Sequence, residues 1–211
     1  MKIMKKLLVF DFDGVIADSL DILWEFFDKI NKKYKFFTFK NKDELTRLWD
    51  QNLFETVTKL GVSKEDFIKF YNEWVKLLIL NNEKMRLFDG LKPILEKLSQ
   101  NNYLVIISSN DDKIISDFLK RNELSDYFTS IFGTEMGISK KIKLEMALNE
   151  FKIPKGLTYF ITDTIGDLKE LKKFGIRTVA VTWGYHDKEK LEKARPNFIV
   201  KTPDELLELF L

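Results

Sequence analysis

Cysteine is absent from this chain of 211 residues, and histidine occurs once. Without cysteine there can be no disulfide bond, thiolate metal site or cysteine nucleophile. A single histidine excludes zinc sites built from several imidazoles and argues against Ser-His-Asp catalysis. Any hydrolytic chemistry must therefore use carboxylates, hydroxyls and lysines. The one histidine, His186, follows a Trp-Gly-Tyr turn, and we expect it at the surface.

An excess of charge of one sign is also missing, because 35 Lys and Arg face 33 Asp and Glu, a net charge of +2. Proteins that bind nucleic acid through its phosphates need clustered cations, so we expect no nucleic-acid partner. No apolar run approaches the roughly 20 residues of a membrane span, and Asp11 interrupts the first one. We therefore expect a cytoplasmic protein without a membrane partner. The length slightly exceeds one domain of about 150 residues, which favours one domain with an insertion.

Short apolar runs recur along the chain, and helical patterns separate the later ones. Continuous apolar runs bounded by polar or turn residues are typical of strands buried on both faces. The expected strands are 7–10, 103–107, 130–132, 157–161, 178–181 and 197–200, and the expected helices are 112–121, 141–151, 166–174, 188–194 and 203–211. This alternation predicts an α/β fold, a doubly wound parallel sheet with helices on both faces.

The stretch from about residue 19 to residue 83 breaks the alternation and contains only helical patterns. Large apolar residues recur every three or four positions in three stripes, which we interpret as core packing. Ser63 followed by Asp66 is typical of a helix start, with Ser as the N-cap. The sequence therefore predicts a small helical module inserted after the first strand. The three stripes are Leu20, Leu23, Trp24, Phe27, Ile30 and Tyr34; Leu45, Leu48, Trp49 and Leu53; and Phe67, Tyr71, Trp74 and Leu78.

Pairs of aspartates follow two of the expected strands. Asp11 and Asp13 come directly after the first strand, where alternation sends both to one side and Gly14 lets the backbone turn away. Asp163 ends a later strand, and Asp167 lies about one helical turn beyond it. Both pairs also suit ordinary turns or helix caps. As a functional site, the four carboxylates would meet at the carboxyl edge of the sheet and require a hard cation.

A hydroxyl-rich loop and a run of lysines follow two further strands. Ser108, Ser109 and Asn110 offer a hydroxyl and loop amides that can hold an anionic oxygen, although an ordinary turn has the same composition. The lysines of residues 140–143 open a helix and individually suit a solvated surface. Carboxylates, hydroxyl and lysine at one edge together indicate magnesium-dependent phosphoryl transfer, because Mg²⁺ takes carboxylate oxygens and lysine balances phosphoryl charge.

These motifs resemble those of the haloacid dehalogenase superfamily of phosphohydrolases. The sequence DFDGVIADS at residues 11–19 resembles the first motif, Ser108 with Ser109 and Asn110 the second, a lysine of the 140–143 run the third, and Asp163 with Asp167 the fourth. Residues 181–185 and 188–211 resemble the phosphoglycolate phosphatase branch. The resemblance covers nearly the whole chain and implies a three-layer core of residues 1–17 and 88–211, with a helical-bundle cap of residues 18–87.

The resemblance also implies roles for individual residues. Asp11 would be the nucleophile that forms an aspartyl phosphate, and Asp13 the general acid and then the base. Mg²⁺ would be held by Asp11, by the main-chain carbonyl of Asp13 and by Asp163, with Asp167 acting through water or orienting the other ligands. Ser108 would bind phosphoryl oxygens. The phosphoryl-binding lysine is assigned to Lys141, and the substrate-binding set is Gly14, Ser109, Asn110 and Arg47.

Two positions depart from the family pattern. The third-motif lysine is usually followed by proline, but Ile142 follows Lys141 here, so Lys140 and Lys143 stay open. The fourth motif usually has glycine where this chain has Thr162, whose side chain would crowd the site or pack behind it.

The expected function is a Mg²⁺-dependent phosphatase for a small phosphomonoester, such as phosphoglycolate or a sugar phosphate. The expected partner is a small phosphorylated metabolite, and the expected state is a monomer or weak homodimer. Arg47 and Arg86 could meet an anionic leaving group, although their positions favour ordinary surface charges. A sugar-phosphate mutase of the same superfamily is the alternative. A receiver-type phosphorylation switch is disfavoured because receivers carry their acceptor later in the sheet, and a dehalogenase because Asp13 is present.

Overall fold

A computed structural model describes residues 5–50, 53–134 and 138–211. Six parallel strands form one sheet in the order β5-β4-β1-β6-β7-β8, so the first strand lies near the centre. Phe10 of β1 is level with Ile106 of β4 and Ile161 of β6. This register brings the carboxyl ends of the three central strands to one edge. The strands are β1 (Leu7–Phe10), β4 (Tyr103–Ile107), β5 (Ser130–Phe132), β6 (Thr158–Thr162), β7 (Arg177–Val181) and β8 (Phe198–Val200).

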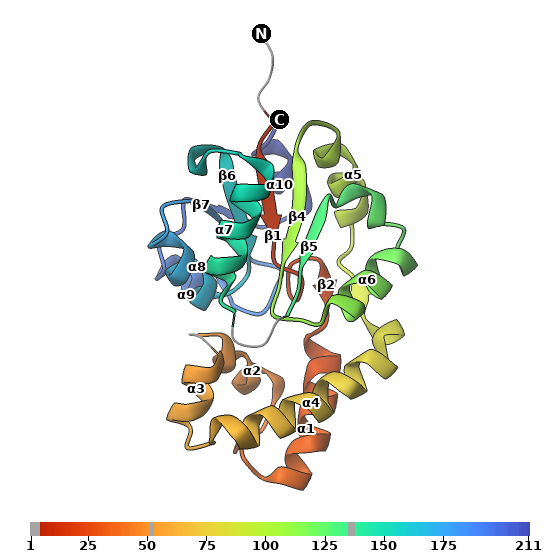
Figure 1. Ribbon diagram of the computed structural model, residues 1–211, viewed down its shortest axis with the longest axis vertical. Coiled ribbons are helices and arrows are strands. Elements are labelled where there is room, and N and C mark those ends of the chain that lie inside the picture. Colours follow the sequence, from red (N-terminus) through yellow and green to blue (C-terminus); the bar gives the residue numbers. More distant parts are fainter. Residues whose placement is uncertain (1–4, 51–52, 135–137) are drawn as a thin grey trace.

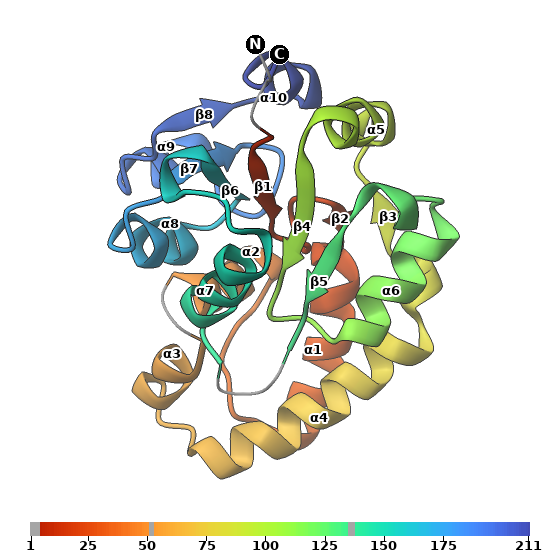
Figure 2. The ribbon, with the colours of Figure 1, turned by 45° about the horizontal axis from the view of Figure 1, so that its top comes forward.

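Helices cover both faces of the sheet, which gives three layers (Figure 2). Alternation along β1 divides its side chains between the faces. Leu8 and Phe10 belong to the larger core with α5, α6 and α10, whereas Leu7 and Val9 pack in a second core with α7 and α8. All four side chains are fully buried. These helices are α5 (Leu91–Asn101), α6 (Asp112–Arg121), α7 (Lys140–Phe151), α8 (Ile165–Lys172) and α10 (Pro203–Glu208), with α9 (Lys188–Glu192) beside α8.

The segment between β1 and α5 forms the helical module. A two-stranded antiparallel ribbon, β2 (Ala17–Asp18) with β3 (Arg86–Leu87), lies at its two ends. Figure 1 shows helices α1 to α4 beyond the carboxyl ends of the parallel strands, so the module faces the edge where the aspartates lie. Its elements are α1 (Leu20–Tyr34), α2 (Lys42–Leu45), the 3-10 helix η1 (Thr46–Trp49), α3 (Leu53–Lys59), α4 (Lys64–Leu80) and the 3-10 helix η2 (Asn82–Lys84).

Aromatic packing holds the helical module together. The buried Phe27 of α1 contacts Phe37, Phe70 and Trp74, with ring centroids 5.1 to 5.5 Å apart. Full burial of each such side chain contributes about 1.5–3 kcal/mol. The Ser63 hydroxyl accepts a hydrogen bond from the Asp66 N–H at 3.1 Å, as expected for the N-cap of α4. The predicted stripes are therefore core packing.

The predicted fold class is confirmed, with differences in detail. Strand and helix bounds agree to within a few residues. Helix α5 was not predicted, although its buried residues Leu91, Ile94, Leu95 and Leu98 have helical spacing. The stripe at residues 45–53 is divided among α2, η1 and α3 rather than forming one helix. The domain boundaries after residues 17 and 87 stay a prediction. In the described part of the chain, no helix has the length and apolar character that a membrane crossing requires.

Candidate active site

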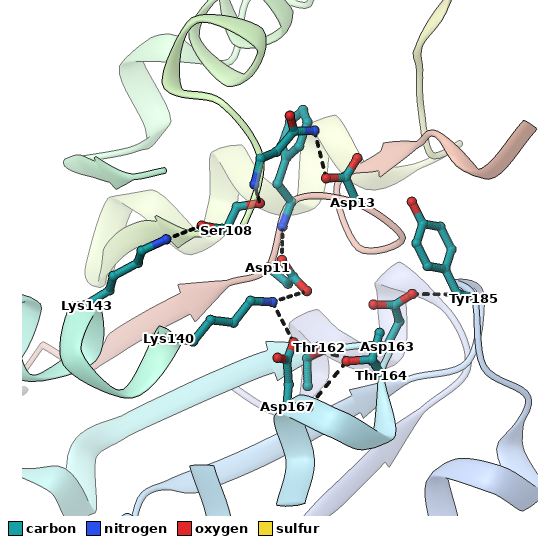
Figure 3. Close-up of polar contacts among 12 residues, drawn as sticks. Asp11, Asp13, Ser108, Lys140, Lys143, Thr162, Asp163, Thr164, Asp167 and Tyr185 are labelled. Carbon is teal, nitrogen blue, oxygen red and sulfur yellow. Dashed lines mark hydrogen bonds and ion pairs between the residues drawn. The ribbon is translucent and has the colours of Figure 1, made fainter. Parts of the chain in front are cut away.

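Polar side chains follow β1, β4 and β6 where these strands end together. Asp11 is 5% exposed, Ser108 1% and Asp163 0%. Figure 3 shows all three converging from separate strands, with Asp13 nearby. Phe12, between the two N-terminal aspartates, turns the other way and packs edge-on against Phe118. The predicted alternation therefore delivers both aspartates to the site.

Asp11 has both carboxylate oxygens engaged. Its Oδ1 accepts a hydrogen bond from the Phe12 N–H at 2.8 Å, and its Oδ2 lies 2.7 Å from Lys140 Nζ. The same ammonium lies 2.6 Å from Asp167 Oδ2. Burial raises the pKa of Asp11 well above its usual value, and the Asp167 and Asp163 charges add to this effect while Lys140 opposes it. Burial disfavours the ionised form of Asp11. Lys140 holds this carboxylate in place and offsets part of its negative charge.

The lysine at the site is Lys140, which corrects the assignment of Lys141. Helix α7 begins at Lys140, after the N-cap Ser139. Residues i and i+3 share a helix face, so Lys140 and Lys143 both turn toward the sheet. Lys141 lies on another face, where it is exposed and its ammonium is 5.7 Å from the Phe174 ring centroid. The helix start decides which lysine of the run reaches the carboxylates.

Asp163 and Asp167 have opposite surroundings. Asp163 Oδ2 accepts the Tyr185 N–H at 2.7 Å, but its buried Oδ1 has no hydrogen-bond partner. Burial raises the pKa of Asp163 from its usual value near 3.8 to about 7. Burial acts on Asp167 as well, but the Lys140 charge holds its pKa below the usual value. Thr162 supports this pairing, because its hydroxyl donates to Asp167 Oδ2 at 2.8 Å.

The donor set fits Mg²⁺. This ion takes oxygen ligands, keeps several waters and is commonly bound through one or two carboxylates plus substrate phosphates. Asp163 Oδ1 is a buried carboxylate oxygen without a partner, which a cation would satisfy. Among the described residues, no three Asp, Glu or His side chains are arranged to hold a metal by themselves. An ion bound at Asp163 would share its coordination with substrate and water.

Asp13 is held from two sides. Asn110 Nδ2 donates to its Oδ2 at 2.8 Å, and the Ser19 hydroxyl donates to its Oδ1 at 2.6 Å. Burial raises the pKa of Asp13, and these two hydrogen bonds oppose the rise. Asn110 thus contacts the predicted acid, in addition to the role in substrate binding that its loop position predicted.

The loop after β4 is fixed by contacts from three directions. The Ser108 hydroxyl accepts the Asn110 N–H at 3.0 Å, and buried Lys143 donates to the Ser108 carbonyl at 2.6 Å. Ser109 is exposed, and its carbonyl accepts from the Tyr71 hydroxyl of α4 at 3.1 Å. The helical module, which is the predicted cap, therefore contacts the loop that the sequence predicts to bind phosphoryl oxygens.

Gly14 has a backbone role that its sequence position only hinted at. It has φ +75°, and a Cβ there would lie 1.9 Å from Asp163 Oδ2. Only glycine permits this approach without displacing the carboxylate. Arg47, the predicted substrate contact on the cap, is exposed on η1. Substrate contacts by either residue stay predictions.

Two residues near the site were missed or misread in the sequence. Tyr185 was given no role in the site, although residues 181–185 resemble the phosphoglycolate phosphatase branch. Lys143, which stayed open as the phosphoryl-binding lysine, instead donates to the Ser108 carbonyl.

His186 is 2% exposed rather than a surface residue. Its Nδ1 accepts the Ile165 N–H at 3.0 Å, and its Nε2 lies 3.2 Å from the Thr46 carbonyl of η1. The cap covers this histidine, a contact between segments 140 residues apart.

Sequence comparison agrees with this arrangement of motifs. The sequence model of the haloacid dehalogenase-like hydrolases matches residues 8–181, which include all four motifs. The chain belongs to the haloacid dehalogenase-like hydrolase family. The predicted resemblance is therefore confirmed. The carboxylate cluster lies at the carboxyl edge of the sheet, as the positions of the aspartates after the strands predicted.

Individual relatives match over nearly their full length. A phosphoglycolate phosphatase of Synechococcus elongatus is 26% identical over 95% of this chain and 95% of its own. A putative pyrophosphatase PpaX of Caldanaerobacter subterraneus subsp. tengcongensis is 23% identical over 96% of this chain and 93% of its own. The crystal structure of a predicted phosphatase from Clostridium acetobutylicum superposes with a TM-score of 0.87 at 20% identity, covering 98% of each chain. The structural likeness confirms the fold.

Proposed function

We propose that this hydrolase is a Mg²⁺-dependent phosphatase of a small phosphomonoester. The observation that carries the proposal is the Asp11–Lys140–Asp167 cluster, in which one ammonium lies 2.7 Å from the buried Asp11 carboxylate and 2.6 Å from the partly buried Asp167 carboxylate. A carboxylate held in a fixed orientation can act as a nucleophile. A neighbouring cation can offset the charge of the incoming phosphoryl group. The names of the relatives, which include phosphatases and pyrophosphatases, support the same reaction class.

In the proposed reaction, the Asp11 carboxylate attacks phosphorus and forms an aspartyl phosphate. The Ser108 hydroxyl and the Asn110 region bind phosphoryl oxygens, and Lys140 offsets their charge. The side chains of Asp11 and Asp163 and the Asp13 carbonyl would hold Mg²⁺, while Asp167 orients Lys140. Bound Mg²⁺ would supply additional positive charge to the phosphoryl oxygens.

Asp13 completes the proposed cycle as an acid and a base. Its raised pKa favours the protonated form that can deliver a proton to the departing oxygen. Asp13 then takes a proton from the water that hydrolyses the aspartyl phosphate. The cap would cover the leaving group and exclude bulk water. The monomeric or weakly dimeric state and the cytoplasmic location stay predictions.

Hydrolysis of p-nitrophenyl phosphate, with and without Mg²⁺, tests the reaction. We expect Mg²⁺-dependent, repeated turnover in the wild type and none in Asp11→Asn. Full activity in that variant would contradict the nucleophile assignment. Phosphorylation without turnover would indicate a receiver-type switch, and transfer to a sugar phosphate rather than water would indicate a mutase.

A panel of phosphorylated metabolites tests the substrate. It should include phosphoglycolate, sugar phosphates and pyrophosphate, because the matched relatives carry both phosphoglycolate phosphatase and pyrophosphatase names. The expected result is a preference for a small phosphomonoester. Preference for pyrophosphate would contradict that substrate class but not the reaction.

A further inference from the structure

Tyr185 lies between the cap and two aspartates of the site, Asp13 and Asp163. Its N–H donates to Asp163 Oδ2 at 2.7 Å, and its phenol oxygen lies 2.7 Å from the Ser19 hydroxyl. Its ring contacts Trp49 of η1, with centroids 5.2 Å apart. Figure 3 shows the ring rising from beside Asp163, with the phenol oxygen toward Asp13. Tyr185 thus contacts Asp163 on the predicted metal-binding side, Ser19 directly before α1, and Trp49 within the cap.

Ser19 does not make the hydrogen bond that is usual at its position in the chain. It is the N-cap residue of α1, yet its side chain makes no capping hydrogen bond, unlike Ser63 of α4 and Ser139 of α7. A serine N-cap contributes about 1 kcal/mol when it bonds the helix. The fully buried Ser19 hydroxyl instead lies 2.6 Å from Asp13 Oδ1. The Ser19 hydroxyl therefore bonds a residue of the site instead of capping α1.

When Asp13 is ionised, the available protons fix the direction of the hydrogen bonds that run from Tyr185 through Ser19 to Asp13. A carboxylate only accepts hydrogen bonds, and a serine hydroxyl has one proton. Ser19 therefore donates to Asp13, and the phenol of Tyr185 donates to Ser19. A phenol has an ordinary pKa of about 10 and therefore carries its proton at neutral pH. With Asn110 on the other oxygen, both oxygens of Asp13 are restrained.

We propose that Tyr185 is a positioning residue that acts through Ser19 to hold Asp13 in the orientation that serves the leaving group. The inference rests on the proposed phosphatase function and adds Tyr185 to it. Because the ring packs against Trp49, the position of the cap and the orientation of Asp13 are linked through one side chain. If the cap were displaced, Asp13 would therefore lose this orientation before the leaving group of the substrate departs.

The test compares leaving groups in Tyr185→Phe, which keeps the ring and the backbone N–H but lacks the phenol oxygen. The probes are p-nitrophenyl phosphate, whose leaving group departs without a proton, and an alkyl phosphate, whose leaving group needs one. Phosphoglycolate or glycerol 2-phosphate serves as the alkyl probe, whichever the wild type hydrolyses faster. The measure is kcat/KM, which covers the steps up to phosphorylation of Asp11. We expect about a tenfold loss for the alkyl phosphate and less than about a threefold loss for p-nitrophenyl phosphate.

Two further variants isolate the route. Ser19→Ala should give the same selective loss, and the double variant should lose no more than Ser19→Ala alone, because coupled residues are not additive. Tyr34→Phe, which removes a phenol bonded to Glu73 on the cap surface, should leave both kcat/KM values unchanged. Thermal unfolding of each variant checks folding.

The outcomes separate this inference from the proposed function. Equal losses for both probes, or multiplied losses in the double variant, would overturn the positioning role of Tyr185. No loss in Tyr185→Phe would overturn it as well. If the wild type shows no Mg²⁺-dependent hydrolysis, or if Asp11→Asn is active, the proposed function itself fails first.

Discussion

Two aspartates of the β6–α8 segment, four residues apart, meet opposite electrostatic surroundings, with Asp163 fully buried and the Asp167 side chain 13% exposed. Asp167 receives the Lys140 ammonium at 2.6 Å and the Thr162 hydroxyl at 2.8 Å, and its pKa is lowered. Asp163 receives a backbone N–H, keeps one oxygen without a partner, and has its pKa raised to about 7. Lys140 forms an ion pair with Asp167, whereas no ion pair with Asp163 is found among the described residues. The comparison therefore supports the proposal that an external cation binds on the Asp163 side.

The largest effect is expected from removing the internal cation. Lys140→Met leaves Asp11 and Asp167 without a positive neighbour, so hydrolysis should fall by at least about 100-fold. The matched Lys141→Met, at an exposed position of the same helix, should stay within about twofold of wild type. Steady-state kinetics with p-nitrophenyl phosphate measures both. A larger loss in Lys141→Met than in Lys140→Met would show that Lys141 is the lysine that serves the reaction.

Removing the uncompensated charge should have opposite effects on folding and on metal binding. Without metal near pH 8, Asp163→Asn should be more stable than wild type by up to about 4 kcal/mol, since one pKa unit corresponds to about 1.36 kcal/mol. Stabilisation by Mg²⁺, about 2.7 kcal/mol at 100 times Kd in the wild type, should vanish. Chemical denaturation with and without Mg²⁺ measures both. Asp117→Asn, a surface control paired with Lys113, should show neither change.

The pH dependence tests the same side of the site. The raised pKa means that the metal-free protein loses stability as the pH rises from about 4 to about 7, because only the unfolded state readily releases the Asp163 proton. Mg²⁺ needs the ionised form, so its affinity should fall about tenfold per pH unit below about 7. Mg²⁺ titrations followed by thermal unfolding from pH 5.5 to 8 would show it. A pH-independent affinity would be incompatible with Asp163 as a ligand.

The smallest effect concerns the support of Asp167. Thr162→Val removes the hydrogen bond to Asp167 Oδ2, worth about 1 kcal/mol, and should lower kcat roughly fivefold. Thr158→Val removes another buried hydroxyl of β6, bonded to the Pro154 carbonyl, and should leave kcat unchanged. Equal kcat values for the two variants would show that Thr162 only fills space.

Local patterns predicted most of the fold because burial of short apolar runs dictates the strands. Phe12 illustrates the limit of such patterns: alternation correctly separates it from Asp11 and Asp13 but does not show what holds those carboxylates. The missed helix α5 has a clear apolar stripe, so it was within reach of the sequence. His186 was not, because the residues that bury it come from a distant segment, η1.

The sequence by itself excluded cysteine chemistry and multi-histidine metal sites, because cysteine is absent and histidine occurs once, and it pointed to aspartates, a hydroxyl and a lysine as the candidate groups. It also determined that Asp11, Ser108 and Asp163 end neighbouring strands. Only the tertiary structure decided that Lys140 is the lysine beside Asp11, because the start of α7 sets which residue faces the sheet. It alone separated the compensated Asp167 from the uncompensated Asp163, because electrostatic compensation depends on distance in space rather than on position in the chain.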